Sequence, residues 1–371
     1  MNHTSLRSYA EISLGQVASN YRALRAAVGP EIEVLAVVKA NAYGHGTVEV
    51  SRKLVSEGAN WLAVASLDEG KELREAGIRS PRILVMSGFP ISEPAAFVEY
   101  GLTPVVHSLE DVARLAGERI AYHLKIDSGM GRLGTRAGTA EILNAVRRTG
   151  HAEMEGLMTH LASASDYTSG QTGDQLANFE KLRRELRGAG VSPRYIHISC
   201  SSPVVYGHKT AWGTLVRAGL ALYGYSPPVQ GAAPKRIVDV KPALSWKARI
   251  LAVKDVPAGT PIGYSARYRT PGPARIAMVT AGYADGVPHQ LSNKGSFIAA
   301  GKIVPIRGAV SMDVTTIDIT DCPALAPGDP VTLIGSEGDA TLTADDMAQA
   351  AGEISYSILC GISGRVKRVY V

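Results

Sequence analysis

Two lysines lie at the ends of apolar segments, where an amine could react with a carbonyl compound. Lys39 follows the apolar run 34–38 in AVVKANAYGHG, and Lys125 lies near the end of the run 120–126. An ammonium group is costly to bury, so a lysine in such a place either reaches water or gives up its proton more easily. A neutral amine is the form that attacks aldehydes. Lys39 is therefore a candidate Schiff-base lysine, with a solvated lysine as the alternative.

Other polar side chains follow later apolar runs. His160 lies near the end of the run 154–161, His197 lies inside the run 195–200, and Ser201 and Ser202 come next. In a barrel of parallel strands, the active site forms where strands end and loops begin. We expect these side chains to face the same end of the barrel as Lys39, although histidines on buried strands can also be purely structural.

A glycine motif follows the run 120–126. Gly129, Gly131 and Gly134 fit the spacing G-x-G-x-x-G that marks dinucleotide-binding loops. The motif lies in mid-chain, and Arg132 and the residues after it do not open a convincing helix. We therefore expect these glycines to provide tight turns rather than a nucleotide site.

The elements that must position these residues alternate along the first two thirds of the chain. Residues 13–28 have helical periodicity, and Ser66, Ser108 and the segment 174–188 mark further helices. Eight short apolar runs are typical of strands buried on both faces. Eight such strands between helices favour a closed (β/α)8 TIM-type barrel over an open doubly wound sheet. The eight runs are 34–38, 61–65, 82–86, 103–107, 120–126, 154–161, 195–200 and 220–223.

The pattern changes near residue 240. From Pro242 onward, short β-branched runs are separated by Pro-Gly, Asp-Gly and Gly-Asp turns, and one short helix is expected at 344–351 with Thr343 as its cap. We therefore expect a barrel over residues 9–238 and a mainly-β domain over 239–371, with residues 1–8 packed on the second domain.

Composition excludes several classes of protein. The net charge of +5 is small for 371 residues and is no nucleic-acid signature. No apolar run is long enough to cross a membrane, and no secretory signal is apparent, so we expect a cytoplasmic protein without a membrane partner. Cys200, Cys322 and Cys360 have no C-x-x-C spacing, which argues against disulfides and against a metal site.

Eight segments together resemble the alanine racemases. AVVKANAYGHG at 36–46 is similar to the family's pyridoxal-phosphate lysine motif, and HLKIDSGMGRLG at 123–134 is similar to its barrel-mouth loop. Six more segments resemble the family in the same order along the chain. They are YAEISLGQVASNYRALR, GLMTHLASA, VRAGLALYG, IGYSARY, TAGYADG with SMD, and SYSILCGIS.

The resemblance implies pyridoxal 5′-phosphate as cofactor. It makes Lys39 the lysine that carries the cofactor, and Arg217 the partner of the pyridine nitrogen, with His160 and His197 on either side of Arg217. A guanidinium can only donate, so the ring nitrogen would stay unprotonated, which favours simple proton return over transamination. The phosphate would be held by Tyr43, Ser201, Gly219, Leu220 and Tyr356.

The resemblance also implies racemisation by two bases in a homodimer. Lys39 would serve one face of the α-carbon, and Tyr264 of the partner subunit would serve the other. Arg132 and the Met312 backbone would meet the substrate carboxylate, and Lys125 matches a position that is carbamylated in many family members. The product D-alanine would supply peptidoglycan.

Two residues depart from the family pattern. Ala309 replaces a common arginine, and Cys200 replaces an asparagine before the phosphate-binding serine. If residues 307–309 form an extended strand, Arg307 points the same way as Ala309 and could supply the missing charge.

Three alternatives remain open. The chain could be a racemase of broader or different specificity, for serine or a basic amino acid, or a related basic amino-acid decarboxylase. It could also be a non-catalytic pyridoxal-phosphate carrier, although the β domain with Tyr264 and Met312 argues against this.

Overall fold

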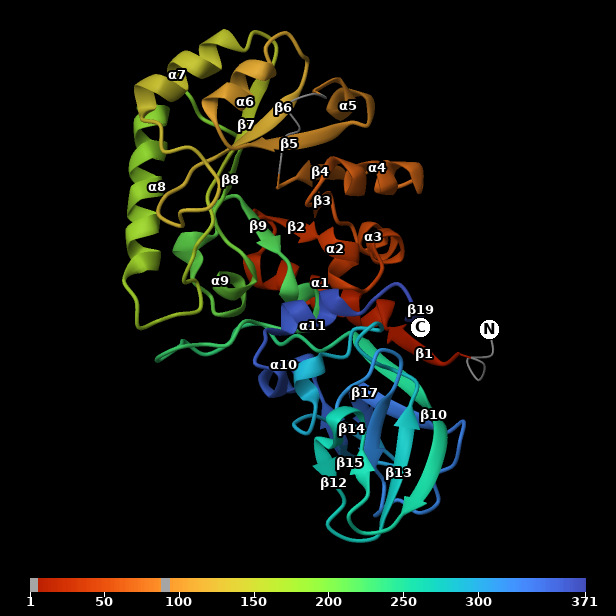
Figure 1. The fold of residues 1–371 in the computed structure, drawn as a ribbon. Helices are drawn as coiled ribbons and strands as arrows, with labels where there is room; N and C mark the ends of the chain where they lie inside the picture. The colour runs from red at the N-terminus through yellow and green to blue at the C-terminus, as the bar shows by residue number, and fades with distance from the viewer. Residues whose placement is uncertain (1–5, 88–93) are drawn as a thin grey trace. The chain divides into compact units, whose positions relative to one another are not determined.

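The computed structural model describes residues 6–87 and 94–371, and the chain divides into two compact units (Figure 1). One unit comprises Gln16–Ala42 and Thr47–Lys241. The other comprises the N-terminal segment through Gly15, Tyr43–Gly46 and Pro242–Val371.

The first unit is a barrel of eight parallel strands, as the sequence predicts. Neighbouring strands pair in chain order from β2 to β8, and β2 also pairs with β9. The ring closes between β8 and β9 through backbone bonds, among them Thr214 N–H to the Ile196 carbonyl at 2.8 Å. The strands are β2 (Glu33–Val37), β3 (Trp61–Val64), β4 (Arg82–Val85), β5 (Leu102–Val106), β6 (Ala121–Lys125), β7 (Glu153–Met158), β8 (Tyr195–His197) and β9 (Leu215–Ala218).

Helices lie outside this ring of strands (Figure 1). The predicted caps are confirmed, since Ser66 Oγ accepts the N–H of Glu69 and Ser108 Oγ accepts the N–H of Asp111. The helices are α1 (Leu14–Val28), α3 (Thr47–Ser56), α4 (Leu67–Glu75), α5 (Pro94–Glu99), α6 (Leu109–Arg114), α7 (Thr139–Arg148), α8 (Gln171–Gly188) and α9 (Ser201–Val205). The segment labelled α2 (Lys39–Tyr43) is a left-handed turn rather than an α-helix.

The prediction of the eighth strand is wrong. Residues 220–223 form a 3-10 helix, and the strand is β9, five residues earlier. Arg217 interrupts the apolar run of β9, which hides this strand from a search for continuous apolar residues. In the fold Arg217 is 4% exposed and points into the barrel, because the other barrel strands supply its hydrogen-bond acceptors.

The second unit is mainly β. Its largest sheet has the order β15-β14-β17-β10-β1-β19, with β13 and β16 joined at β10 and β18 joined at β17. The predicted helix at 344–351 is confirmed, and Thr343 caps it through a reciprocal pair of bonds with Asp346. The strands are β1 (Ser8–Ile12), β10 (Leu244–Val256), β11 (Pro261–Ile262), β12 (Tyr268–Arg269), β13 (Ala274–Val279), β14 (Ser296–Ala299), β15 (Lys302–Pro305), β16 (Thr315–Asp318), β17 (Pro330–Glu337), β18 (Ala340–Leu342) and β19 (Lys367–Tyr370); the helices are α10 (Ala344–Ala351) and α11 (Ser355–Gly361).

Candidate active site

Lys39 stands at the start of a left-handed turn directly after β2. Residues 40–43 all have φ between 51° and 53°, and the N–H of Ala42 donates to the Val38 carbonyl at 3.0 Å. Left-handed backbone costs L-residues roughly 1–2 kcal/mol each and persists where surrounding bonds hold it, often at functional sites. One such bond joins Ala40 N–H to the Glu69 carboxylate at 2.8 Å. The fold thus holds a strained left-handed turn directly after Lys39, at the carboxyl end of β2.

Positive charge gathers at this end of the barrel. Lys125 is the last residue of β6 and is buried. Burial lowers its pKa, and the charges of Arg217, Arg132 and Lys39 lower it further, to about 8. Because cations so arranged attract anions, the site suits a ligand that carries carboxylate or phosphate groups.

Arg217 of β9 is anchored by the barrel interior. Its two terminal nitrogens donate to the carbonyls of Thr159, His197 and Ile198 at 2.8–2.9 Å and to ring nitrogens of His160 and His197 at 3.1 Å. Burial lowers the pKa of Arg217 to about 10, so the group stays cationic near neutral pH. Among the described residues no acceptor meets its Nε–H, which leaves one oriented donor for a ligand atom.

His160 and His197 flank Arg217 as neutral rings. Burial, together with the charge of Arg217, lowers the pKa of His160 to about 3 and holds the pKa of His197 well below its ordinary value. Since Arg217 donates to Nδ1 of both rings, the proton of each neutral ring is on Nε2. The longer run 154–161 predicted that His160 lies on a strand. Strand β7 ends at Met158, so His160 lies two residues beyond it.

A set of donors lies at the ends of β8 and β9. Ser201 Oγ accepts the N–H groups of Gly219 and Ala221 at 3.1 and 3.2 Å, which brings two separate segments together. Among the described residues no acceptor meets the Leu220 N–H. Cys200 makes no capping bond to α9, and burial raises the pKa of its thiol, so it stays neutral. The arrangement can bind an oxyanion, but position 200 contributes only a weak donor.

The glycine loop after β6 provides tight turns, as the sequence predicts. Gly129, Gly131 and Gly134 have φ of 140°, 73° and 118°. Asp127 Oδ1 accepts three successive N–H groups of residues 129–131 at 2.9–3.2 Å, which shapes the approach to Arg132. Burial would raise the pKa of Asp127, but these bonds and the one from Arg136 lower it to about 2.

The remaining predicted site residues belong to the second unit. Tyr43 and Tyr356 face each other with ring centroids 6.0 Å apart. Tyr264 is 74% exposed at the start of a short turn in which Ser265 and Ala266 have positive φ, and Met312 is 52% exposed. Both are large side chains left in solvent by this unit.

The expectation for Arg307 is wrong. Strand β15 ends at Pro305, and Gly308 with φ of 78° separates Arg307 from Ala309, so the alternation of an extended strand does not hold. Arg307 lies 3.7 Å from the Asp318 carboxylate and stacks over the Tyr268 ring at 4.7 Å, while Ala309 is buried. Arg307 is thus engaged in a structural ion pair.

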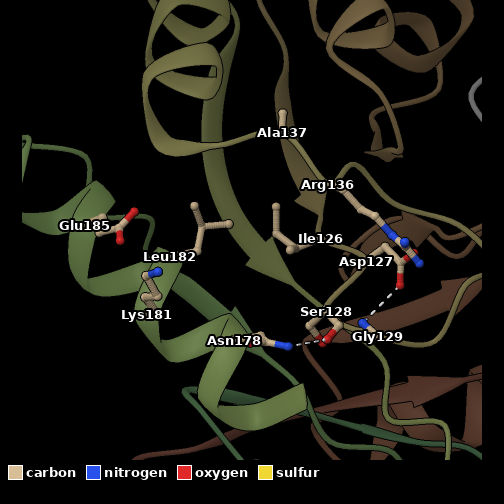
Figure 2. Close-up of a pocket in the computed structure, with 10 residues that line it drawn as sticks. All are labelled: Ile126, Asp127, Ser128, Gly129, Arg136, Ala137, Asn178, Lys181, Leu182 and Glu185. Atoms are coloured by element: carbon tan, nitrogen blue, oxygen red, sulfur yellow. Dashed lines mark hydrogen bonds and ion pairs between the residues drawn. The ribbon is translucent and has the colours of Figure 1, made fainter. Parts of the chain in front are cut away.

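A pocket of about 410 Å³ lies between the loop after β6 and helix α8, and Figure 2 shows the residues that line it. Asn178 bonds to the Ser128 carbonyl at its edge. None of its lining residues is a predicted site residue, although Asp127 and Gly129 belong to the loop that carries Arg132. Among the described residues no group of three or more metal-ligating side chains occurs.

Sequence reasoning overlooked several residues that shape the site. Glu69 accepts a hydrogen bond from the turn after Lys39, and Asp127 accepts one from the loop that carries Arg132. His123 lies between the Glu155 carboxylate and His197, which contacts Arg217. Only His123 and Asp127 carried a signal, since both lie inside the segment 123–134 that resembles the family. The other two act through contacts between distant strands and helices.

Comparison with known proteins agrees with this arrangement. The model described as alanine racemase, N-terminal domain, matches residues 12–227, and the one for the C-terminal domain matches residues 243–370. The chain is 38% identical to the alanine racemase of Carboxydothermus hydrogenoformans over 98% of this chain and 99% of that protein.

Solved structures show the same likeness. The alanine racemase of Streptomyces lavendulae superposes with a TM-score of 0.91 at 35% identity, covering 99% of this chain and 97% of that one. The Bartonella henselae alanine racemase with covalently bound pyridoxal phosphate superposes with a TM-score of 0.86 at 28% identity, covering 98% of this chain and 99% of that one. The chain belongs to the alanine racemase family, and it is an amino-acid racemase, an isomerase.

Proposed function

We propose that this protein interconverts L-alanine and D-alanine with pyridoxal 5′-phosphate, using Lys39 and the partner subunit's Tyr264 as its two bases. The observation that carries the proposal is the set of cationic and donor groups around Lys39 at one end of the barrel. The full-length likeness to alanine racemases supports alanine as the substrate.

The residues fit the cofactor. The Arg217 Nε–H would face the pyridine nitrogen, and Ser201, Gly219 and the Leu220 N–H would hold the phosphate. The resemblance to the family adds Tyr43 and Tyr356, whose ring centroids lie 6.0 Å apart. When bound, pyridoxal phosphate would withdraw electrons from the α-carbon of the amino acid and make its proton acidic. Arg217 would limit that withdrawal, because a guanidinium beside the ring nitrogen can only donate and would leave the nitrogen unprotonated.

Two groups must move the proton because racemisation removes it from one face of the α-carbon and returns it to the other. The Lys39 amine serves one face. Tyr264 serves the other, and the neutral His160, whose Nε2 carries a proton, links the tyrosine oxygen to Arg217. Arg132 and the Met312 backbone orient the substrate carboxylate, so that the α-hydrogen points at a base.

A homodimer completes each site in this proposal. Tyr264 and Met312 are 74% and 52% exposed, and a base in open solvent would lack the shielding that catalysis requires. A second copy of the chain that covers them supplies this shielding.

Mixed dimers test the shared site. Lys39→Ala and Tyr264→Phe proteins are mixed after separate purification and allowed to exchange subunits, with each parent alone as control. If Tyr264 acts across the interface, half the dimers are mixed and one site in each is native, so about a quarter of wild-type activity returns. No recovery despite proven exchange would place Tyr264 in its own subunit's site.

The activity is tested with purified protein and a panel of amino acids. Loss of optical rotation from L-alanine and from D-alanine, with deuterium entering the α-position from D2O, is expected. Faster racemisation of serine, lysine or arginine would change the substrate, and cofactor binding without exchange of any α-hydrogen would indicate a carrier.

The product assigns a cellular role. D-Alanine made in the cytoplasm would supply peptidoglycan, and no helix in the described part of the chain is long and apolar enough to cross a membrane. A bacterial strain that lacks its own alanine racemases and depends on added D-alanine should grow without it when this chain is expressed.

A further inference from the structure

A chain of buried polar side chains runs through the barrel from Arg217 to Arg82. Arg217 bonds to Nδ1 of His197 at 3.1 Å, and Nε2 of His197 lies 2.8 Å from Nδ1 of His123. Nε2 of His123 lies 3.3 Å from the Glu155 carboxylate, which also accepts from both terminal nitrogens of Arg82. Both histidines are fully buried, so water cannot replace these partners.

The hydrogen bonds of this chain can run in only one direction. Arg217 has no acceptor atom, so Nδ1 of His197 must accept and its Nε2 must carry the proton. That proton then goes to Nδ1 of His123, which leaves the proton of His123 on Nε2, facing the carboxylate. Burial lowers the pKa of both rings, which agrees with two neutral histidines. Arg217 at one end and the Glu155 carboxylate at the other thus both require the tautomer with the proton on Nε2 in each ring.

The strands are built to admit this chain. The pairing of β6 and β7 shifts register between Tyr122 and His123, so that His123 lies opposite Gly156 and Glu155 is the extra residue. Such a bulge re-aims a side chain, here the Glu155 carboxylate toward His123. A Cβ on Gly156 would lie 2.3 Å from Cγ of His123, so only glycine leaves room for the ring.

An aromatic ring packs against Arg82, the residue at the other end of this series of hydrogen bonds from Arg217. The Arg82 guanidinium lies over the Trp61 ring at 4.3 Å and pairs with both oxygens of Glu155. Burial alone would raise the pKa of Glu155, but the bond from His123 lowers it most and the bonds from Arg82 lower it further, so the carboxylate stays ionised.

We infer that Glu155 is a positioning residue for the racemase reaction. Through His123 it holds Nδ1 of His197 as an acceptor, and His197 in turn orients the Arg217 guanidinium toward the cofactor ring. This inference rests on the proposed function of Arg217. No carboxylate of the described residues pairs with Arg217 directly, and the chain of two imidazoles is how a buried anion reaches it. Successive hydrogen bonds polarise one another, so the anion also strengthens the Arg217–His197 bond.

The direction of the chain is tested first in the wild-type holoenzyme, by nitrogen NMR of protein with 15N-labelled histidine at pH 7.5. The signals are assigned with His123→Gln and His197→Gln. Both residues should show a protonated Nε2 and an unprotonated Nδ1. A proton on Nδ1 of either ring, or a doubly protonated ring, would overturn the inference, whether or not the protein racemises alanine.

The role of Glu155 is tested with Glu155→Gln, and Arg82→Gln is the matched control because it breaks the same ion pair but keeps the carboxylate. Glu155→Gln should shift the Nδ1 signal of His197 and lower kcat/KM for alanine about 10-fold, as loss of an outer partner typically does. Arg82→Gln should lower thermal stability but leave the His197 signal in place.

The remaining outcomes also decide the question. An unchanged His197 signal in Glu155→Gln, or equal shifts in both variants, would mean that the pair only stabilises the barrel. If Glu155→Gln does not fold, Glu155→Asp should shift the same signal because its carboxylate falls short of His123. An unchanged His197 signal in that variant would likewise overturn the inference.

Discussion

Lys125 should react with carbon dioxide to form a carbamate. The ammonium first loses a proton; the neutral amine then attacks CO2, a nitrogen–carbon bond forms as one C=O π bond opens, and a second proton leaves, so a cation becomes an anion. The reaction needs the unprotonated amine, and burial with the charges of Arg217, Arg132 and Lys39 provides it by lowering the pKa of Lys125. The same positive charges stabilise the carbamate once it forms.

The size of the effect follows from the pKa. With a pKa of about 8 instead of 10.5, the neutral fraction of Lys125 at pH 7 rises from roughly 0.03% to roughly 9%, about 300-fold. The neutral fraction increases as pH rises through the pKa. At a fixed concentration of dissolved CO2, carbamate on Lys125 should therefore increase steeply between about pH 7 and pH 9.

Carbon NMR of the enzyme in 13C-labelled bicarbonate measures the carbamate directly, and Lys125→Gln is the control that removes it. Activity should fall after CO2 is purged and return with bicarbonate. Lys125→Glu should retain more activity than Lys125→Gln, because a carboxylate replaces the anion beside Arg132. Absence of a carbamate signal at pH 9 under high CO2, or a signal that persists in Lys125→Gln, would refute this reasoning.

Four further results are expected. Borohydride reduction of the yellow holoenzyme should fix the cofactor on Lys39, and a reduced adduct that mass spectrometry places on another lysine would contradict the assignment. Tyr264→Phe should slow deuterium exchange from L-alanine far more than from D-alanine, since only one face loses its base; equal slowing would exclude a face-specific role. Because the pKa of His160 is about 3 when folded and near 6.5 when unfolded, unfolding takes up a proton below pH 6.5, and the free energy of unfolding falls as pH falls toward 3. His160→Gln should reduce the slope of this free energy against pH by about 1.4 kcal/mol per pH unit, measured by urea unfolding at pH 4–6. An identical slope in the variant would show that His160 is already protonated in the folded protein. Gly156→Ala should lower the free energy of unfolding by about 1–3 kcal/mol because its Cβ would clash with His123, and full stability would mean that β7 can shift.

Local patterns in the sequence determined much of the fold. Seven of the barrel strands could be found as apolar runs, because a strand covered on both faces has no polar side and reads as a continuous stretch. The Ser66, Ser108 and Thr343 caps could be found because a capping bond joins residues three apart in the chain.

Site residues close to a motif could also be predicted as candidates. Lys39 follows an apolar run, Lys125 lies near the end of another, and the resemblance to the family named Arg217 and Tyr264. The sequence could not show that residues 40–43 form a left-handed turn, since Ala40 and Ala42 have no preference for that conformation. The bonds from Glu69 and within the turn that hold it come from the folded barrel.

Tertiary structure alone decided where charged groups lie inside the barrel. The eighth strand escaped prediction because Arg217 looks like a surface residue until the carbonyls of neighbouring strands surround it. In the sequence Arg307 could supply the charge that Ala309 lacks, but in the fold it contacts Asp318 and Tyr268 of the β domain. Glu155 faces His123 only because a bulge in β7 turns it inward. In each case the environment of a charge depends on strands far apart in the sequence, and no local pattern carries that information.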